Sequence, residues 1–236
     1  MAKVIIFSGA GISAESGIPT FRDNDGLWEN YNIKDICTVG CLDKNREETI
    51  KFYDMLRVGL ENKVPNHAHK QIAKIQEKYP LDIQIITQNV DDMFEKAGCT
   101  DIMHLHGYLK EVYCSKCNYM ADIGYKKQDE VLTDCLQCHE PLRPNIVFFG
   151  EQAPMYKDLY ESLVECELLI IIGTSGYVID VKYLSSFPKK TILNNLEPSN
   201  AIEEDLLSKV IYKKATDAID EIVEEIEVFL EESNNK

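Results

Sequence analysis

The chain has 236 residues, 44% hydrophobic and 28% charged, which is ordinary for one globular domain or for a domain with an insertion. Its 40 acidic and 25 basic residues give a net charge of −15, which repels phosphates, so we expect no direct binding to nucleic acid. No apolar run reaches the roughly 18 residues of a membrane span and no signal peptide is recognised, so we expect a cytoplasmic protein without membrane contact.

Short apolar runs at six places predict β-strands, and helical patterns lie between most of them. The predicted strands are residues 4–7, 83–87, 101–105, 168–172, 191–193 and 209–212. Helices are predicted at 68–78 and in the tail, where apolar residues from Ile219 to Leu230 recur at helical spacing. Because strands alternate with helices, we expect an α/β fold with a doubly wound, parallel, Rossmann-like sheet.

Two segments break this alternation and predict a smaller, inserted domain. Residues 24–63 are helical without a strand, and residues 113–143 carry clustered cysteines among loops and short hairpins. We therefore expect a large domain made of residues 1–23, 64–112 and 144–236. The helical module and the cysteine module should pack together as the small domain, leaving a cleft beneath it.

A glycine loop follows the first predicted strand. Residues 9–14, Gly-Ala-Gly-Ile-Ser-Ala, fit the G-x-G-x-x-G/A pattern, in which the backbone closely approaches a pyrophosphate. The alternative is a plain strand-to-helix turn of small residues. Pro19 excludes the continuous helix of a dehydrogenase, so we expect a different mode of dinucleotide binding. A loop carrying Phe21, Arg22 and Trp28 would fold over the ligand.

Two C-x2-C pairs, 17 residues apart, have the spacing of a zinc ribbon. Cys114, Cys117, Cys135 and Cys138 would close a tetrahedral shell, which leaves no open position for catalysis. Two alternatives are a redox dithiol and, because His139 completes C-x-x-C-H, a c-type haem site. The haem alternative requires export and leaves the first pair unexplained, so a structural zinc is the favoured interpretation.

Polar residues follow three predicted strands at their carboxyl ends, where parallel sheets bind ligands. They are residues 87–91 (Thr-Gln-Asn-Val-Asp), His104 with His106, and residues 173–176 (Gly-Thr-Ser-Gly). Each group alone is typical of a turn or a helix cap. Together they predict a cleft lined by amides, a carboxylate, hydroxyls and an imidazole. His106, next to a glycine at the strand end, is the better placed general base.

In chain order these segments resemble the sirtuin family. The matching segments are 9–13, 17–22, 87–91, 105–107, the two cysteine pairs, 143–151, 173–175 and 195–197. The resemblance implies an NAD-dependent protein-lysine deacylase that consumes NAD and releases nicotinamide and an O-acyl-ADP-ribose. The acyl oxygen of the lysine would attack the ribose, and His106 would take a proton from a ribose hydroxyl. Acetyl is the most expected acyl group, with succinyl, malonyl or longer acyl groups as alternatives, and acyl-lysine proteins or peptides are the expected partners.

The resemblance also implies site residues of three kinds besides the zinc ligands. His106 and Asn89 would be catalytic. NAD would be held by Gly9, Ala10, Gly11, Ser13, Thr20, Phe21, Arg22, Trp28, Gln88, Asn89, Val90, Asp91, Gly173, Thr174, Ser175, Asn195, Leu196, Glu197 and Ala215. The substrate would contact Tyr53 and Arg57, and pair as an added strand with Val147, Phe148, Phe149, Gly150 and Glu151.

The sequence departs from the family pattern at two positions. Relatives that remove succinyl or malonyl groups place an arginine three residues after the tyrosine equivalent to Tyr53, where this chain has Leu56. Arg57, one position later, either reaches the acyl carboxylate or lies at the surface. Asp180 stands where the family has a proline after the Gly-Thr-Ser loop. Mono-ADP-ribosyl transfer and a non-catalytic module that binds NAD or acyl-lysine are the alternative functions.

Overall fold

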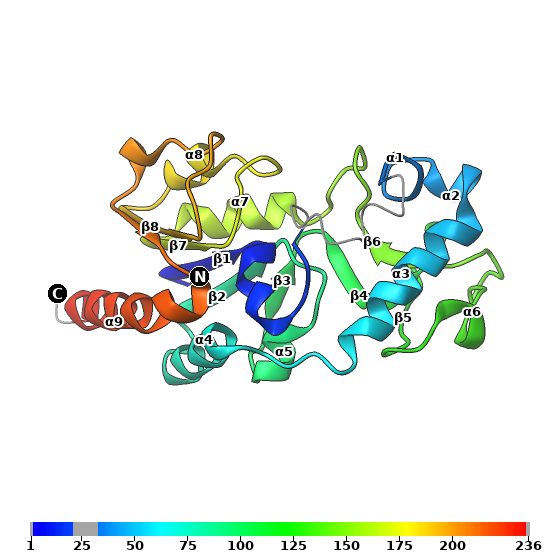
Figure 1. Cartoon of the computed structure of the whole chain (residues 1–236), viewed down its shortest axis with the longest axis horizontal. Coiled ribbons are helices and arrows are strands. Elements are labelled where there is room, and N and C mark those ends of the chain that lie inside the picture. Colours follow the sequence, from blue (N-terminus) through cyan, green and yellow to red (C-terminus); the bar gives the residue numbers. More distant parts are fainter. Residues whose placement is uncertain (1, 21–32, 235–236) are drawn as a thin grey trace.

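The computed structural model describes residues 2–20 and 33–234 (Figure 1). The predicted cofactor contacts Phe21, Arg22 and Trp28 lie outside the described residues. The larger part of the molecule is built around a six-stranded parallel sheet in the order β3-β2-β1-β7-β8-β9. Its strands are β1 (Val4–Ser8), β2 (Ile83–Thr87), β3 (Ile102–His104), β7 (Leu168–Ile172), β8 (Lys190–Asn195) and β9 (Lys209–Tyr212).

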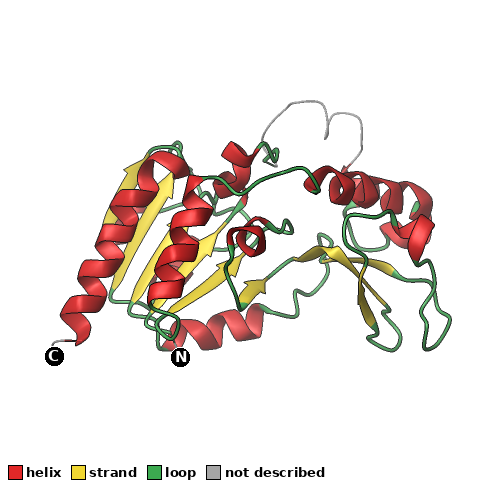
Figure 2. Cartoon of the chain, turned by 90° about the horizontal axis from the view of Figure 1, so that it is seen from below, coloured by secondary structure: helices red, strands yellow, loops and turns green. Residues whose placement is uncertain are grey.

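Helices cover both faces of this sheet, as the sequence predicts (Figure 2). On one face lie α4 (His67–Lys78), α5 (Met93–Ala97) and α9 (Ala215–Asn234) with the 3-10 helix η1 (Ala10–Ser16), and on the other lie α7 (Tyr156–Val164) and α8 (Val181–Ser185). Alternate residues of β1 separate the two cores: Val4 and Ile6 pack on the α9 face, Ile5 and Phe7 on the α7 face. Burial on both faces explains the continuous apolar runs.

The smaller part lies beside the carboxyl ends of the strands (Figures 1 and 2). It combines three helices, an antiparallel sheet in the order β5-β4-β6 and one short helix. Their bounds are α1 (Ile33–Ile36), α2 (Cys41–Lys44), α3 (Arg46–Leu60), β4 (Gly107–Tyr113), β5 (Met120–Asp122), α6 (Gln128–Val131) and β6 (Arg143–Ile146). The antiparallel sheet begins at Gly107, within the residues assigned above to the large domain.

A buried ion pair joins the helical and cysteine modules. Arg57 is fully buried, forms an ion pair with Asp54 and donates a hydrogen bond to the carbonyl of Leu109 on β4. Asp54 also accepts a hydrogen bond of 2.9 Å from the amide of Gln128, the first residue of α6. These contacts connect α3, β4 and α6. They pack α3, from the predicted helical module, against β4 and α6.

The sequence locates the large sheet well. The predicted strands 83–87, 168–172 and 209–212 match β2, β7 and β9, and the other three differ by one or two residues at their ends. The main local difference is the glycine loop, which continues into η1, a 3-10 helix ending at Gly17, rather than into an α-helix. Among the described residues, no helix has both the length and the apolar character needed to cross a membrane.

Candidate active site

The glycine loop and the loop after β7 touch through their backbones. The amide of Gly11 donates to the carbonyl of Gly173 at 2.9 Å. A Cβ atom on Gly11 would lie 2.7 Å from Cα of Gly173, and one on Gly173 would lie 2.5 Å from the amide nitrogen of Ile12. Gly173 also has a φ of +67°. The close contact between the two loops is therefore the first reason for glycine at these positions. Because these residues lack side chains, the backbone at this edge of the sheet stays uncovered, as a pyrophosphate site requires.

Thr174 connects the ends of three strands. Its hydroxyl accepts a 3.0 Å hydrogen bond from Nε2 of Gln88, which follows β2. Its carbonyl accepts a 2.8 Å hydrogen bond from Nδ2 of Asn195, the last residue of β8. Parallel strands bring these side chains to one edge, so residues separated by more than a hundred positions line the same cleft.

A buried polar network lies beneath the glycine loop. The Ser13 hydroxyl donates to the Asp91 carboxylate at 2.9 Å and accepts from Nδ2 of Asn89 at 3.2 Å. The Met93 amide also donates to Asp91 at 3.1 Å, but burial dominates and raises the pKa of Asp91 to about 6. His69 lies 3.5 Å from Ser13, and burial lowers its pKa to about 3, so its imidazole is neutral. Among the predicted cofactor residues, Ser13 therefore links Asn89 and Asp91.

The two histidines at the end of β3 have different surroundings. His104 contacts a carboxylate oxygen of Glu95 at 2.7 Å through Nε2, and donates from Nδ1 to the carbonyl of Asn89 at 2.9 Å. Burial opposes its positive charge, but Glu95 and the Asn89 carbonyl outweigh it and raise the pKa of His104. His104 therefore holds the loop that carries Asn89, and both of its ring nitrogens are occupied.

His106 has the geometry of a general base. Its Nδ1 lies 3.1 Å from the carbonyl of Gln88, and its Nε2 lies 3.0 Å from the hydroxyl of Tyr156. Burial lowers the pKa of His106 below 6.5, and the Gln88 carbonyl offsets only part of this effect, so the ring is neutral at pH 7. Since a carbonyl only accepts, the proton is on Nδ1 and the lone pair is on Nε2. This is the tautomer that a base at Nε2 requires.

The remaining predicted cofactor residues lie around this edge with fewer contacts. The carbonyl of Val90 accepts from the amide of Leu109, and the carbonyl of Ser175 accepts from the Ser199 hydroxyl at 2.6 Å. Leu196 and Glu197 are exposed beyond β8, and Ala215 is buried at the start of α9. Ala10 and Thr20 are half-buried. The contacts of these residues with NAD stay predictions.

The predicted peptide-binding segment, residues 147–151, is held between the two parts of the molecule. The Val147 amide donates to the carbonyl of His106 at 2.9 Å, and the Phe149 amide donates to the carbonyl of Cys37 at 2.8 Å. Glu151 accepts two hydrogen bonds from Arg143, at 2.7 and 2.9 Å, and one from the Phe148 amide at 2.9 Å. Glu151 therefore stabilises the conformation of the segment. A peptide strand added here would use the remaining groups of the segment, including those of Gly150.

The two residues predicted to contact the acyl group are buried in the small part. Tyr53 is 5% exposed and packs on the rings of Phe52 and Phe148. Arg57 is committed to Asp54 and Leu109, as described above, and Leu56 is half-buried. The structure therefore places the Arg57 guanidinium in the protein interior rather than toward a ligand.

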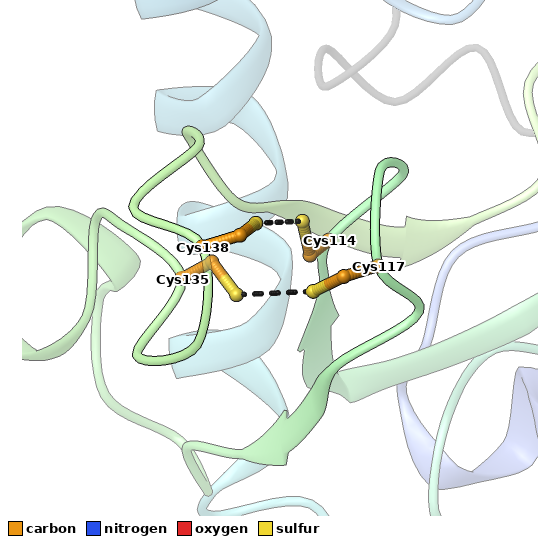
Figure 3. Close-up of side chains that lie close together, drawn as sticks. All are labelled: Cys114, Cys117, Cys135 and Cys138. Carbon is orange, nitrogen blue, oxygen red and sulfur yellow. Dashed lines mark hydrogen bonds between the residues drawn. The ribbon is translucent and has the colours of Figure 1, made fainter.

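The four clustered cysteines fit a tetrahedral zinc ion (Figure 3). Their sulfur atoms all lie within 4.8 Å of one another, with Cys114 to Cys138 and Cys117 to Cys135 at 3.4 Å. Zn–S bonds of about 2.3 Å place the sulfurs of a tetrahedron about 3.8 Å apart, within this range. A disulfide would need about 2.05 Å. All eight cysteines lie within the described residues and are unpaired.

Both cysteine pairs are built on the same turn. The residue after each second cysteine, Asn118 or His139, has a φ of +59° and donates its amide to the carbonyl of the first cysteine at 2.9 Å. His139 is exposed at this left-handed position, where histidine and asparagine are tolerated better than most residues. The C-x-x-C-H sequence is therefore explained by the turn.

The sequence analysis missed two residues of this site. Tyr156 and His69 contact His106 and Ser13, respectively, from helices α7 and α4. Neither residue is assigned to the site from the sequence alone. No spacing relates either residue to its partner, because the contacts span 50 and 56 positions.

Comparison with known proteins gives one consistent family. The model of the Sir2 family matches residues 9–180. A protein of Campylobacter jejuni (strain RM1221), named NAD-dependent protein deacylase, is 45% identical over 235 residues, covering 99% of this chain and all of that protein. A protein of the same name from Helicobacter hepaticus is 38% identical over 254 residues, covering 97% and 99% of the two chains.

Solved structures of Sir2 homologues have the same fold as this chain. A crystal structure described as a Sir2 homolog–NAD complex superposes with a TM-score of 0.82 at 32% identity, covering 96% of this chain and 90% of that chain. A mutant Sir2 homologue in complex with ADP-ribose has a TM-score of 0.85 at 31% identity, covering 97% and 93%.

Proposed function

Because the chain belongs to the Sir2 family, we propose that it is an NAD-dependent deacylase of protein lysines that consumes NAD and releases nicotinamide and an O-acyl-ADP-ribose. The observation that carries this proposal is the neutral His106, whose Nε2 lone pair lies at the strand ends where Gln88, Asn89 and Thr174 meet. The names of the deacylase relatives support the same reaction.

NAD, bound as the co-substrate, supplies a ribose carbon that becomes electrophilic as nicotinamide leaves. In this proposal the bare backbone of Gly9, Gly11 and Gly173 accommodates the phosphates, with Thr174 and Ser175 beside them. Asn195 and Glu197 would contact the adenosine ribose.

Four residues act at the nicotinamide end in this proposal. Gln88 and Asn89 would orient the nicotinamide ribose, and Asp91 would accept a hydrogen bond from the nicotinamide amide. His106 would take a proton from a ribose hydroxyl at Nε2, while its Nδ1 proton stays on the Gln88 carbonyl. The fixed hydrogen bond at Nδ1 orients the ring, so the base keeps one tautomer through the reaction.

For the acyl group, we propose acetyl or another neutral acyl chain. A succinyl or malonyl carboxylate needs a cation in its pocket, because an unpaired buried charge is costly. Leu56 offers no charge at the family's arginine position, and Arg57 is buried against Asp54. The substrate peptide would lie along residues 147–151, where main-chain pairing tolerates varied sequences.

Zinc has a structural role in this proposal. Four thiolates would complete its coordination and leave no position for water or substrate. The cytoplasm is the compartment we propose, because a reducing environment keeps thiols free for metal binding.

The decisive test is nicotinamide and free-lysine release from an acetylated peptide, with and without NAD. We expect release only with NAD, and at least a hundredfold lower turnover in His106→Ala, in line with the usual contribution of a general base. His67→Ala is the matched control, since His67 is exposed and paired with Asp220 on the α9 face. ADP-ribose found on protein rather than on the acyl group would instead establish mono-ADP-ribosyl transfer, and undiminished turnover in His106→Ala would exclude the proposed mechanism.

A further inference from the structure

Tyr156 is placed by α7 directly against the proposed general base. It is the first residue of α7, and its hydroxyl lies 3.0 Å from Nε2 of His106. The ring of Tyr160, one turn further along α7, packs edge-on against Tyr156 at 6.4 Å, and Tyr183 of α8 packs in the same way on Tyr160 at 5.4 Å. This row of rings fixes the direction in which the Tyr156 hydroxyl points.

The chemistry of the contact assigns the donor. Nδ1 of His106 faces the Gln88 carbonyl and must carry the proton, so Nε2 of the neutral ring can only accept. Tyr156 therefore donates its hydroxyl proton to Nε2. The lone pair that the proposed reaction uses to remove a ribose proton is thus occupied when no substrate is present.

We propose that Tyr156 is a positioning residue that caps Nε2 of His106 in the substrate-free enzyme and yields this nitrogen to the ribose hydroxyl in each turnover. The inference rests on the proposed function. Its consequence is kinetic: the bond stabilises the free enzyme but is absent from the transition state, so it lowers kcat/KM. The contact also lies five residues after Glu151, so the segment proposed to bind the peptide leads directly to the cap.

The test is Tyr156→Phe, which removes the hydroxyl and keeps the ring. We expect kcat/KM for NAD, measured with saturating acetyl peptide, to rise by roughly two- to tenfold, the value of one net hydrogen bond. Tyr160→Phe is the matched control and should leave kcat/KM unchanged. A second readout needs no NAD: the nitrogen NMR resonance of Nε2 in His106 should move in Tyr156→Phe and stay in Tyr160→Phe.

An unchanged or lower kcat/KM in Tyr156→Phe would overturn the proposal, because a capping bond can only oppose the reaction. An unmoved Nε2 resonance would also overturn it, by showing that the bond is absent in solution. If the wild-type protein has no NAD-dependent turnover, the proposed function fails, whereas the NMR comparison still decides whether Tyr156 caps His106.

Discussion

At the scale of single residues, the buried Asp91 carboxylate lowers the stability of the folded protein at neutral pH. The carboxylate is buried beneath the glycine loop, and burial raises its pKa from the ordinary 3.8 to about 6, despite the hydrogen bonds from Met93 and Ser13. The folded protein therefore binds this proton more tightly than the unfolded chain does. The resulting stability is fully present below pH 3.8 and is lost as the pH rises through about 6.

Replacing Asp91 by Asn should remove this loss. We expect Asp91→Asn to raise the free energy of unfolding at pH 7.5 by up to roughly 3 kcal/mol, since one pKa unit corresponds to about 1.4 kcal/mol. The gain should nearly vanish at pH 3.5, where Asp91 is mostly protonated in both states. Urea unfolding at the two pH values measures it. Equal stability of the variant and the wild type at pH 7.5 would contradict the burial argument. The same variant should also release nicotinamide more slowly.

In the proposed function, residue 56 decides the acyl group and the buried Arg57 does not. Leu56→Arg places a cation at the position where the family binds acyl carboxylates, so we expect succinyl turnover relative to acetyl to rise about tenfold or more. Arg57→Leu should leave the acyl preference unchanged and instead destabilise the protein by about 3–5 kcal/mol, because it leaves Asp54 buried without its partner. Matched acetyl- and succinyl-lysine peptides measure the preference. A wild-type preference for succinyl would show that Arg57 leaves Asp54 to bind substrate.

At the scale of elements, the glycine loop and the loop after β7 form one contact. Gly173→Ala adds a Cβ 2.5 Å from the Ile12 amide at a φ of +67°, so strain and collision act together. Gly98→Ala, at the end of α5, has a φ of +102° with open space around its Cβ. We expect Gly98→Ala to cost about 1–2 kcal/mol from backbone strain alone and Gly173→Ala to cost more. Thermal unfolding measures both.

Only the collision displaces the loop that is proposed to bind NAD. Gly173→Ala should therefore also weaken NAD binding by tenfold or more, measured by calorimetry, while Gly98→Ala keeps wild-type affinity. Equal affinity in the two variants would mean that the loops adjust without affecting the cofactor site.

The elements differ in how well they are predicted from sequence, for physical reasons. Strands β2 and β7 are apolar because both faces of the sheet are covered, and this pattern is local. β4 mixes polar and apolar residues because much of it is half-buried, and its partner β6 lies about thirty residues away, beyond the cysteine pairs. No local pattern records that pairing.

The candidate site likewise contains residues whose positions the sequence predicts and residues whose positions depend on tertiary packing. Gln88, Asn89, Thr174 and Asn195 are predictable, because strand ends meet at one edge of a parallel sheet. The positions of Tyr156 and His69 depend on how α7 and α4 pack over the sheet, which strand order alone does not determine. Arg57 shows the converse: its spacing from Tyr53 permits a surface position, whereas packing against Asp54 buries it.

At the scale of the whole molecule, we expect the small part to depend on its metal site for stability. The apolar cluster around the cysteines has only five buried members, two of them proposed zinc ligands, so its burial alone is small. The contacts of Gln128 with Asp54 and with the Leu142 carbonyl, both at 2.9 Å, connect this cluster to α3. Loss of the metal should therefore loosen the cysteine module and α3 together, while the six-stranded sheet keeps its own two cores.

We expect one zinc per chain by metal analysis, and none in the double variant Cys117→Ser with Cys138→Ser. Hydrogen exchange in that variant should accelerate in residues 107–146 and in α3, with β1, β2 and β7 still protected. Its deacylation should fall at least a hundredfold, because Gly107 of β4 directly follows His106. Cys166→Ala, in the core beneath α7, is the control and should retain one zinc. A double variant with wild-type protection in residues 107–146 would show that side-chain packing, rather than the metal, holds the small part in place.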